Sequence, residues 1–202
     1  MRSATSPDIA PAPVARERMR ESLAAHQALL DGDMPERVAD VARLIVSTLG
    51  DGGKLLLFGN GGSAADATHL AAEFVGRFRF DRAPLPALSL SDNGSSVSGI
   101  GNDYGYEDVF ARQVTALGSP GDVAIAISTS GTSPNVVAGL RAARAAGLHT
   151  VALTGAAGGV MPDEAERCLR MPSTDTARVQ ECYMLVGHLV CELVERTLFG
   201  GR

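Results

Sequence analysis

The chain has 202 residues, of which 45% are hydrophobic and 20% charged, and its formal net charge is −5. A length of this order suits a single domain with a sizeable interior. No apolar run reaches the roughly 20 residues of a membrane helix, and the acidic balance argues against a broad nucleic-acid surface, which needs clustered Lys and Arg. We therefore expect neither a membrane nor a nucleic acid as partner.

The three cysteines are Cys168, Cys182 and Cys191. They are odd in number and lack CxxC spacing, and no signal-peptide core lies near the N-terminus. We expect small core residues in a protein of the reduced cytoplasm.

The N-terminal quarter of the chain divides into two parts. Residues 1–13 are rich in Pro, Ala and Ser without apolar periodicity, which predicts a flexible arm. Residues 14–50 repeat apolar side chains at helical spacing on both sides of an Asp-Gly-Asp break, which predicts a pair of helices. The whole of 14–202 is expected to form one domain.

Short apolar runs alternate with helical patterns over residues 51–172. The runs are KLLLF, LPALSL, DVAIAIS and TVALTG, with a weaker fifth at 167–171, and the helical patterns lie at 64–78 and 134–146. Runs of this kind are typical of strands buried on both faces of a parallel sheet. A long helix over 177–199 closes the chain. The sequence thus predicts an α/β fold whose ligands gather beyond the carboxyl ends of the strands.

A glycine loop, Gly59-Asn60-Gly61-Gly62-Ser63, follows the first strand and opens a helix. Backbone amides and the positive helix end would converge there on an anion. Gly59, Gly61 and Ala64 also fit the dinucleotide pattern G-x-G-x-x-A, so a nicotinamide enzyme is an alternative. That alternative lacks its acidic residue about 20 positions further on, because Asp81 precedes the second strand and Asp92 comes late.

A second loop, Ser128-Thr129-Ser130-Gly131-Thr132-Ser133, follows the third run and precedes a helix that begins near Pro134. Its hydroxyl groups can bind a phosphate without Lys or Arg, and the GK[ST] signature of nucleotide P-loops is absent. For Ser133 alone, a cap of the helix is an equally good interpretation.

Two helices carry ligands suited to a divalent metal. His69 and Glu73 are spaced i, i+4 on one face, and Gln180 and His188 lie on the last helix. Taken singly, each can be an ordinary surface residue. Gln180 and His188 are eight residues apart, about 12 Å of helical rise, so one ion would need long converging side chains or a second subunit.

The segments GNGGSAADATHLAAEF and AISTSGTSPN resemble the SIS sugar-phosphate family, specifically its phosphoheptose isomerase branch, and the resemblance covers about residues 20 to 199. It implies an SIS-type three-layer sandwich with a five-stranded parallel sheet flanked by helices. It also implies a homotetramer whose sites are shared between subunits. Thr68 departs from the family pattern, where Gln is frequent before the motif histidine.

The resemblance also implies the functional residues. Glu73 and His188 are expected to be the catalytic residues. One Zn²⁺ per subunit is expected to bind to His69, Glu73, Gln180 and His188. Substrate contacts are expected at Asn60, Gly61, Gly62, Glu73, Asn102, Asp103, Ser128, Thr129, Ser130, Ser133 and Gln180. Asn102 and Asp103 are expected in a turn, and Arg77 either contacts the substrate or lies on the surface.

The implied reaction converts sedoheptulose 7-phosphate to D-glycero-D-manno-heptose 7-phosphate, the first step of nucleotide-activated heptose synthesis. SIS domains also serve as phosphosugar sensors and as a partner of a bacterial replication initiator. Such a non-catalytic protein needs no acid-base pair, whereas this chain carries the full quartet of His69, Glu73, Gln180 and His188. The quartet therefore favours the enzyme.

Overall fold

The computed structural model describes residues 11–200. The chain begins with two helices, α1 (Pro11–Asp31) and α2 (Met34–Gly50), separated at the Asp-Gly-Asp break. The helical pair is thus confirmed, but the expected arm is too long at its C-terminal end, because Pro11 already belongs to α1. The rest of the arm lies outside the described residues.

Five parallel strands form the sheet, as expected. They are β1 (Leu55–Gly59), β2 (Ala87–Ser89), β3 (Val123–Ser128), β4 (His149–Thr154) and β5 (Arg167–Arg170), in the spatial order β2-β1-β3-β4-β5. Every residue of β1 and β3 is buried, as their continuous apolar sequences require. The chain runs outward from β1 to β2 and then returns to place β3 on the other side of β1. The carboxyl ends of β1 and β3 therefore flank the switch point of the topology.

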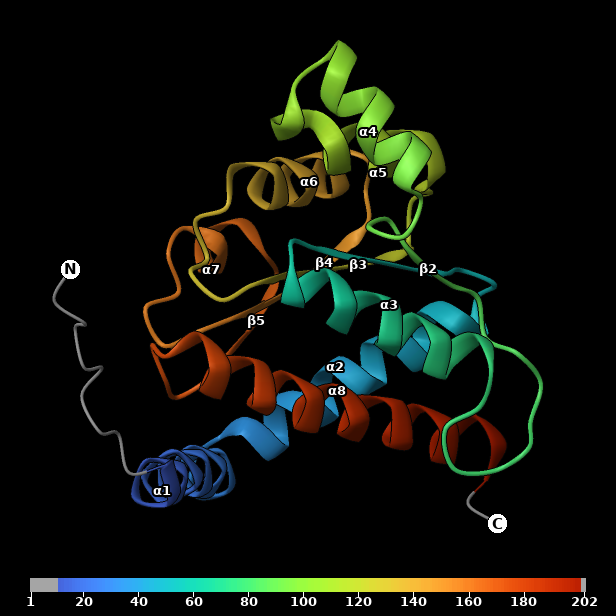
Figure 1. Ribbon diagram of the computed structural model, residues 1–202. Helices are drawn as coiled ribbons and strands as arrows, with labels where there is room; N and C mark the ends of the chain where they lie inside the picture. Colours follow the sequence, from blue (N-terminus) through green and yellow to red (C-terminus); the bar gives the residue numbers. More distant parts are fainter. Residues whose placement is uncertain (1–10, 201–202) are drawn as a thin grey trace, which may run out of the picture.

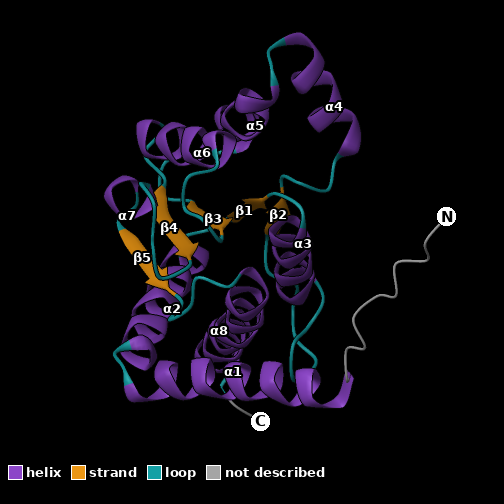
Figure 2. Cartoon of the chain, turned by 60° about the vertical axis from the view of Figure 1, so that its left-hand side comes forward, coloured by secondary structure: helices purple, strands orange, loops and turns teal. Residues whose placement is uncertain are grey.

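Helices cover both faces of the sheet and form a three-layer sandwich (Figures 1 and 2). Besides α1 and α2, the helices are α3 (Gly62–Val75), α4 (Gly94–Asp103), the 3-10 turn η1 (Tyr106–Asp108), α5 (Val109–Leu117), α6 (Pro134–Ala145), α7 (Met161–Glu164) and α8 (Thr176–Phe199). None of these helices, nor α1 or α2, is long and apolar enough to cross a membrane.

Alternate residues of the strands serve two separate cores. Leu55 and Leu57 pack with α2, α3 and α8, while Leu56 and Phe58 pack with α5 and α6 on the opposite face. This is the period of two that a strand imposes on its side chains. Cys182 and Cys191 are buried in the first core, as expected, and burial raises the pKa of Cys191 to about 12.

Asp122 ties together the amino ends of β1 and β3. Its carboxylate accepts hydrogen bonds from the backbone N–H groups of Lys54 (2.9 Å) and Ser119 (2.8 Å), and the Lys54 ammonium lies 2.6 Å away. The Asp122 side chain is 3% exposed. Burial alone would raise its pKa, but these hydrogen bonds outweigh burial and hold the pKa below the ordinary value of 3.8.

We predict that Asp122→Asn lowers the free energy of unfolding at pH 7 by about 2 kcal/mol, because a buried charge pair loses one partner. A lowered folded-state pKa stabilises the fold above the unfolded value and loses this effect as the pH falls. The difference from wild type should therefore shrink below about pH 4. Urea titrations at pH 7, 4 and 3 measure it, with exposed Asp51→Asn as the control. An equal loss for both variants at pH 7 would contradict this role of Asp122.

Candidate active site

Helices α3 and α8 run side by side in the same direction (Figure 1). Near their middle, Gly187 lies against Leu70 so closely that a Cβ at position 187 would be 2.5 Å from the Leu70 Cδ2. Towards their carboxyl ends, the Glu195 carboxylate accepts hydrogen bonds from the backbone N–H groups of Phe78 and Arg79. These contacts fix the register of the two helices and place residue 69 beside residue 188.

The two helices bring together the His/Glu/His cluster, made of His69, Glu73 and His188. The Nε2 atom of His69 lies 3.0 Å from Nε2 of His188 and 3.3 Å from Oε1 of Glu73. One ligand atom from each residue falls within 4.8 Å of the other two. Burial, and then the neighbouring His69, lower the pKa of His188, which favours the neutral imidazole that binds metal. The cluster can hold a divalent ion through two nitrogens and one oxygen.

Gln180, the fourth predicted ligand, lies near the glycine loop (residues 59–63). A Cβ at Gly62 would be 2.2 Å from the Gln180 Nε2. Gly62 precedes His69 by seven residues, about 10 Å along α3. The side chain thus lies at the beginning of α3, about two turns before His69.

The hydroxyl loop (residues 128–133) connects β3 to α6. Ser133 occupies the N-cap position, yet its side chain makes no capping hydrogen bond. Its hydroxyl lies 3.0 Å from that of Ser128, which in turn lies 3.4 Å from that of Ser130. The capping interpretation is therefore wrong, and three of the predicted hydroxyl groups form one polar cluster at the beginning of α6.

The glycine loop and the hydroxyl loop are linked through Asn60. The side-chain amides of Asn60 and Asn135 exchange two hydrogen bonds of 2.8 Å, and the Tyr106 hydroxyl donates to Asn60 Oδ1 at 3.2 Å. Gly61, with φ of +55°, occupies the N-cap position of α3. The two loops meet at the carboxyl ends of β1 and β3, where the sequence places a ligand.

Asn102 and Asp103 lie in the last turn of helix α4, so the turn expected there is wrong. Both side chains are exposed, and the Asn102 amide donates to the Asp103 carboxylate at 2.8 Å. Thr68, the departure from the family pattern, has its hydroxyl 3.0 Å from that of Ser89 on β2. Its side chain therefore joins α3 to the sheet.

A buried ion pair, Arg82 with Glu195, lies next to the His/Glu/His cluster. The Arg82 and Glu195 side chains are 2% and 0% exposed and lie 3.0 Å apart, and Arg82 also donates to the Glu73 carbonyl at 2.8 Å. Together they hold Phe78 so that its ring lies 5.3 Å from the His188 ring. Arg77, in the same segment, is exposed.

Asp66 is a residue of the site that the sequence did not single out. It precedes His69 by one turn of α3, and its Oδ2 atom is buried without a hydrogen-bond partner among the described residues. Burial raises its pKa from 3.8 to about 6, and the nearby His69 opposes the shift. Only the spacing i, i+3 to a candidate ligand could have indicated it.

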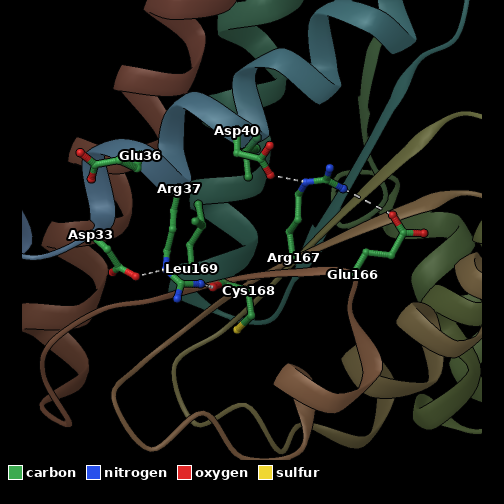
Figure 3. A pocket seen from close by; sticks show the side chains of 9 residues that line it. Asp33, Glu36, Arg37, Asp40, Glu166, Arg167, Cys168 and Leu169 are labelled. Atoms are coloured by element: carbon green, nitrogen blue, oxygen red, sulfur yellow. Dashed lines mark hydrogen bonds and ion pairs between the residues drawn. The ribbon is translucent and has the colours of Figure 1, made fainter.

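A polar cavity of about 430 Å³ lies away from this site, between α2 and β5 (Figure 3). The guanidinium groups of Arg37 and Arg167 are both paired: Arg37 lies 2.7 Å from Asp33, and Arg167 lies 2.6 Å from Asp40. The exposed Glu36 carboxylate also lines the cavity.

Known proteins share this architecture. The SIS domain family model matches residues 21–155. Phosphoheptose isomerases from Roseiflexus sp. (strain RS-1) and Aquifex aeolicus are 54% and 53% identical, over 91% and 79% of this chain and 92% and 84% of their own lengths. A solved phosphoheptose isomerase from Francisella tularensis superposes with a TM-score of 0.90 at 31% identity, covering 93% of this chain and 100% of that one. A solved phosphoheptose isomerase from Neisseria gonorrhoeae has a TM-score of 0.86 at 38% sequence identity, and the match covers 91% of this chain and 98% of that one.

The five-stranded sheet and the family match define the class: the chain belongs to the SIS-domain family. Within that family it belongs to the phosphoheptose isomerases, because relatives of that name match it at about half identity over most of both chains. The resemblance found in the sequence is thus confirmed, and the family is one of isomerases.

Asp66 provides a pH-dependent test of the site. With the folded-state pKa raised to about 6, the ionised carboxylate weakens the fold above that pH, whereas below 3.8 both states are protonated and the effect vanishes. We predict that Asp66→Asn raises the melting temperature of the chelator-treated protein at pH 8 and leaves it unchanged near pH 4. Thermal melts of wild type, Asp66→Asn and the exposed control Asp81→Asn measure this. A lower melting temperature for Asp66→Asn at pH 8 would contradict an unpaired carboxylate.

Proposed function

We propose that this protein interconverts sedoheptulose 7-phosphate and D-glycero-D-manno-heptose 7-phosphate in the cytoplasm, where its three free thiols stay reduced. The observation that carries the proposal is the meeting of Glu73 and His188, a carboxylate and an imidazole from two helices, within 4.8 Å in one cluster. The names of the relatives supply the substrate class.

The reaction moves one proton between C1 and C2 of the sugar and another between the two oxygens, through an enediol. In this proposal Glu73 takes the carbon-bound proton from one of C1 and C2 and returns it to the other. His188 is assigned the oxygen-bound proton, and its lowered pKa leaves the imidazole neutral and able to accept it. The two groups thus divide the proton transfers between them, and no redox cofactor is needed.

In this proposal the hydroxyl loop binds the phosphate group of the substrate. Ser128, Ser130 and Ser133 cluster at the first turn of α6, where the helix dipole favours an anion. Thr129 belongs to the same loop. The glycine loop, Gln180, Asn102 and Asp103 are assigned to the sugar hydroxyls.

The donor set of the cluster fits Zn²⁺, because two imidazole nitrogens and one carboxylate oxygen are typical ligands of this metal. His69, Glu73 and His188 would hold it, with Gln180 as a further ligand after a change of rotamer. Because a group bound to metal is a poorer base, Glu73 and His188 would alternate between holding the metal and moving protons. When bound, Zn²⁺ would polarise the sugar carbonyl and lower the cost of the negative charge that develops on its oxygen.

Turnover of sedoheptulose 7-phosphate by the purified protein tests the proposal. We expect activity that chelation abolishes and Zn²⁺ restores. Glu73→Gln should lower kcat by about 10² to 10⁴, the usual contribution of a positioned base. Glu36→Gln, a change of an exposed carboxylate on α2, should leave kcat unchanged.

The remaining outcomes separate the alternatives. Wild-type turnover by Glu73→Gln would remove Glu73 as the base. If the protein converts five- or six-carbon sugar phosphates faster than sedoheptulose 7-phosphate, the proposed substrate is wrong. Phosphosugar binding without turnover under any metal would indicate a sensor or adaptor, and thermal protection by NAD would revive the dinucleotide alternative.

We further propose a homotetramer assembled through α1 and α8. Helix α1 buries only Ala25 and Leu29 among the described residues and exposes Met19, Leu23 and Leu30 by 67 to 70%. Three leucines of α8, Leu185, Leu189 and Leu193, are 37 to 40% exposed. An apolar cavity of about 300 Å³ lies between α1, α2 and α8. A surface of this kind is typical of contacts between subunits.

The assembly is tested by Leu23→Glu, which places a charge in the proposed contact. We expect the molar mass in light scattering to fall from that of four chains to two or one. Leu117→Glu, at an equally apolar but distant position on α5, should keep the wild-type mass. A tetrameric Leu23→Glu protein would rule out this surface.

A further inference from the structure

Residues 155–160, the segment that follows β4, pack against the hydroxyl loop through backbone hydrogen bonds. We call this segment the glycine platform. The Gly155 N–H donates to the Thr129 carbonyl at 3.1 Å, and the Val160 and Met161 N–H groups donate to the Gly131 carbonyl at 3.0 and 3.3 Å. The backbone of the hydroxyl loop is therefore held at two of its carbonyls.

These contacts orient the donors of the loop. In a trans peptide the N–H points opposite to the preceding C=O. Anchoring the carbonyls of Thr129 and Gly131 thus turns the N–H groups of Ser130 and Thr132 away from the platform. The Thr132 N–H indeed points to the Ser130 hydroxyl at 3.2 Å, inside the polar cluster. The platform therefore turns these two N–H groups toward the polar cluster, where the phosphate is proposed to bind, and the Thr132 N–H holds the Ser130 hydroxyl there.

The contact between the two segments leaves no room for side chains. A Cβ at Gly131, where φ is +68°, would lie 1.9 Å from the Gly158 carbonyl oxygen, and one at Gly159 would lie 2.3 Å from the Gly131 oxygen. The hydroxyl of Thr154 is buried in the same contact without a hydrogen-bond partner among the described residues. A small displacement of the platform must therefore move the loop.

The exposed side chain of Arg170 contacts the platform. Along β5, Arg167 points toward α2 and Cys168 points away from it (Figure 3), so by strand alternation Arg170 lies on the Cys168 side, toward the platform. Its Nη2 atom donates to the Ala156 and Ala157 carbonyls at 2.9 and 3.2 Å. A cation on two successive carbonyls fixes the turn between them.

We infer that Arg170 is a positioning residue for phosphate binding: through the glycine platform it keeps the hydroxyl loop in its anion-binding shape without touching the substrate. The inference rests on the proposed assignment of the phosphate to this loop. It predicts that Arg170 affects the binding of the phosphate group and leaves the chemical step alone.

The test compares Arg170→Met and Arg170→Lys with wild type. Loss of the two hydrogen bonds should raise the Kd for inorganic phosphate and the KM for the phosphosugar about 10-fold, with kcat within twofold. Arg170→Lys should recover part of the affinity, because an ammonium can donate to the same carbonyls. Arg167→Met is the matched control: it removes an Arg from the same strand that pairs with Asp40 instead, and both constants should stay at wild-type values.

The outcomes separate this inference from the proposed function. Weaker phosphate binding by Arg170→Met in a protein whose wild type turns over no sugar would uphold the inference and reject the isomerase. An unchanged phosphate Kd, or a lower kcat at unchanged KM, would overturn the inference. If Arg170→Met fails to fold, Gly159→Ala, whose Cβ would push the Gly131 carbonyl, must weaken phosphate binding in its place.

Discussion

The close approach of α3 and α8 at Gly187 is the contact on which the site depends. A Cβ at this position would lie 2.5 Å from the Leu70 Cδ2, so the buried Leu70 side chain or the two helices would have to shift. The absence of a side chain at Gly187 thus allows the close packing that sets His69 beside His188. The buried pair of Arg82 and Glu195 then secures the same two helices further along. The His/Glu/His cluster is therefore positioned by core packing, which is rigid because interiors are close-packed, and not by surface loops.

The opposite end of the site depends on sheet topology. Because β3 returns to lie beside β1, the loops that follow the two strands are neighbours, and the reciprocal amide pair of Asn60 and Asn135 joins them. The donors gathered there are neutral hydroxyls, amides and helix ends. Such a site can accept a phosphate in a protein whose net charge is −5, since the favourable field is local.

The sequence pattern predicted the buried strands, which depend on local sequence, and missed the side-chain orientations that depend on contacts with distant residues. The apolar runs of β1 and β3 predict buried strands because they are short, continuous and followed at once by loops that contain glycine. Helix α4 was missed because it is rich in Gly and Ser and buries no residue. The Ser133 hydroxyl turns from its own helix to Ser128, and Gln180 lies at Gly62, because residues remote in sequence decide where each side chain points.

The two ends of the site have separate supports. The His/Glu/His cluster is carried by α3 and α8, which pack in the first core, whereas the hydroxyl loop leads into α6, which packs in the second, and is braced by the glycine platform. Under the proposed assignment, a substrate held by its phosphate at the hydroxyl loop and reacting at the cluster would span the distance between these two supports. The proposal therefore implies that the spacing of the two supports by the sheet sets the length of sugar phosphate that fits.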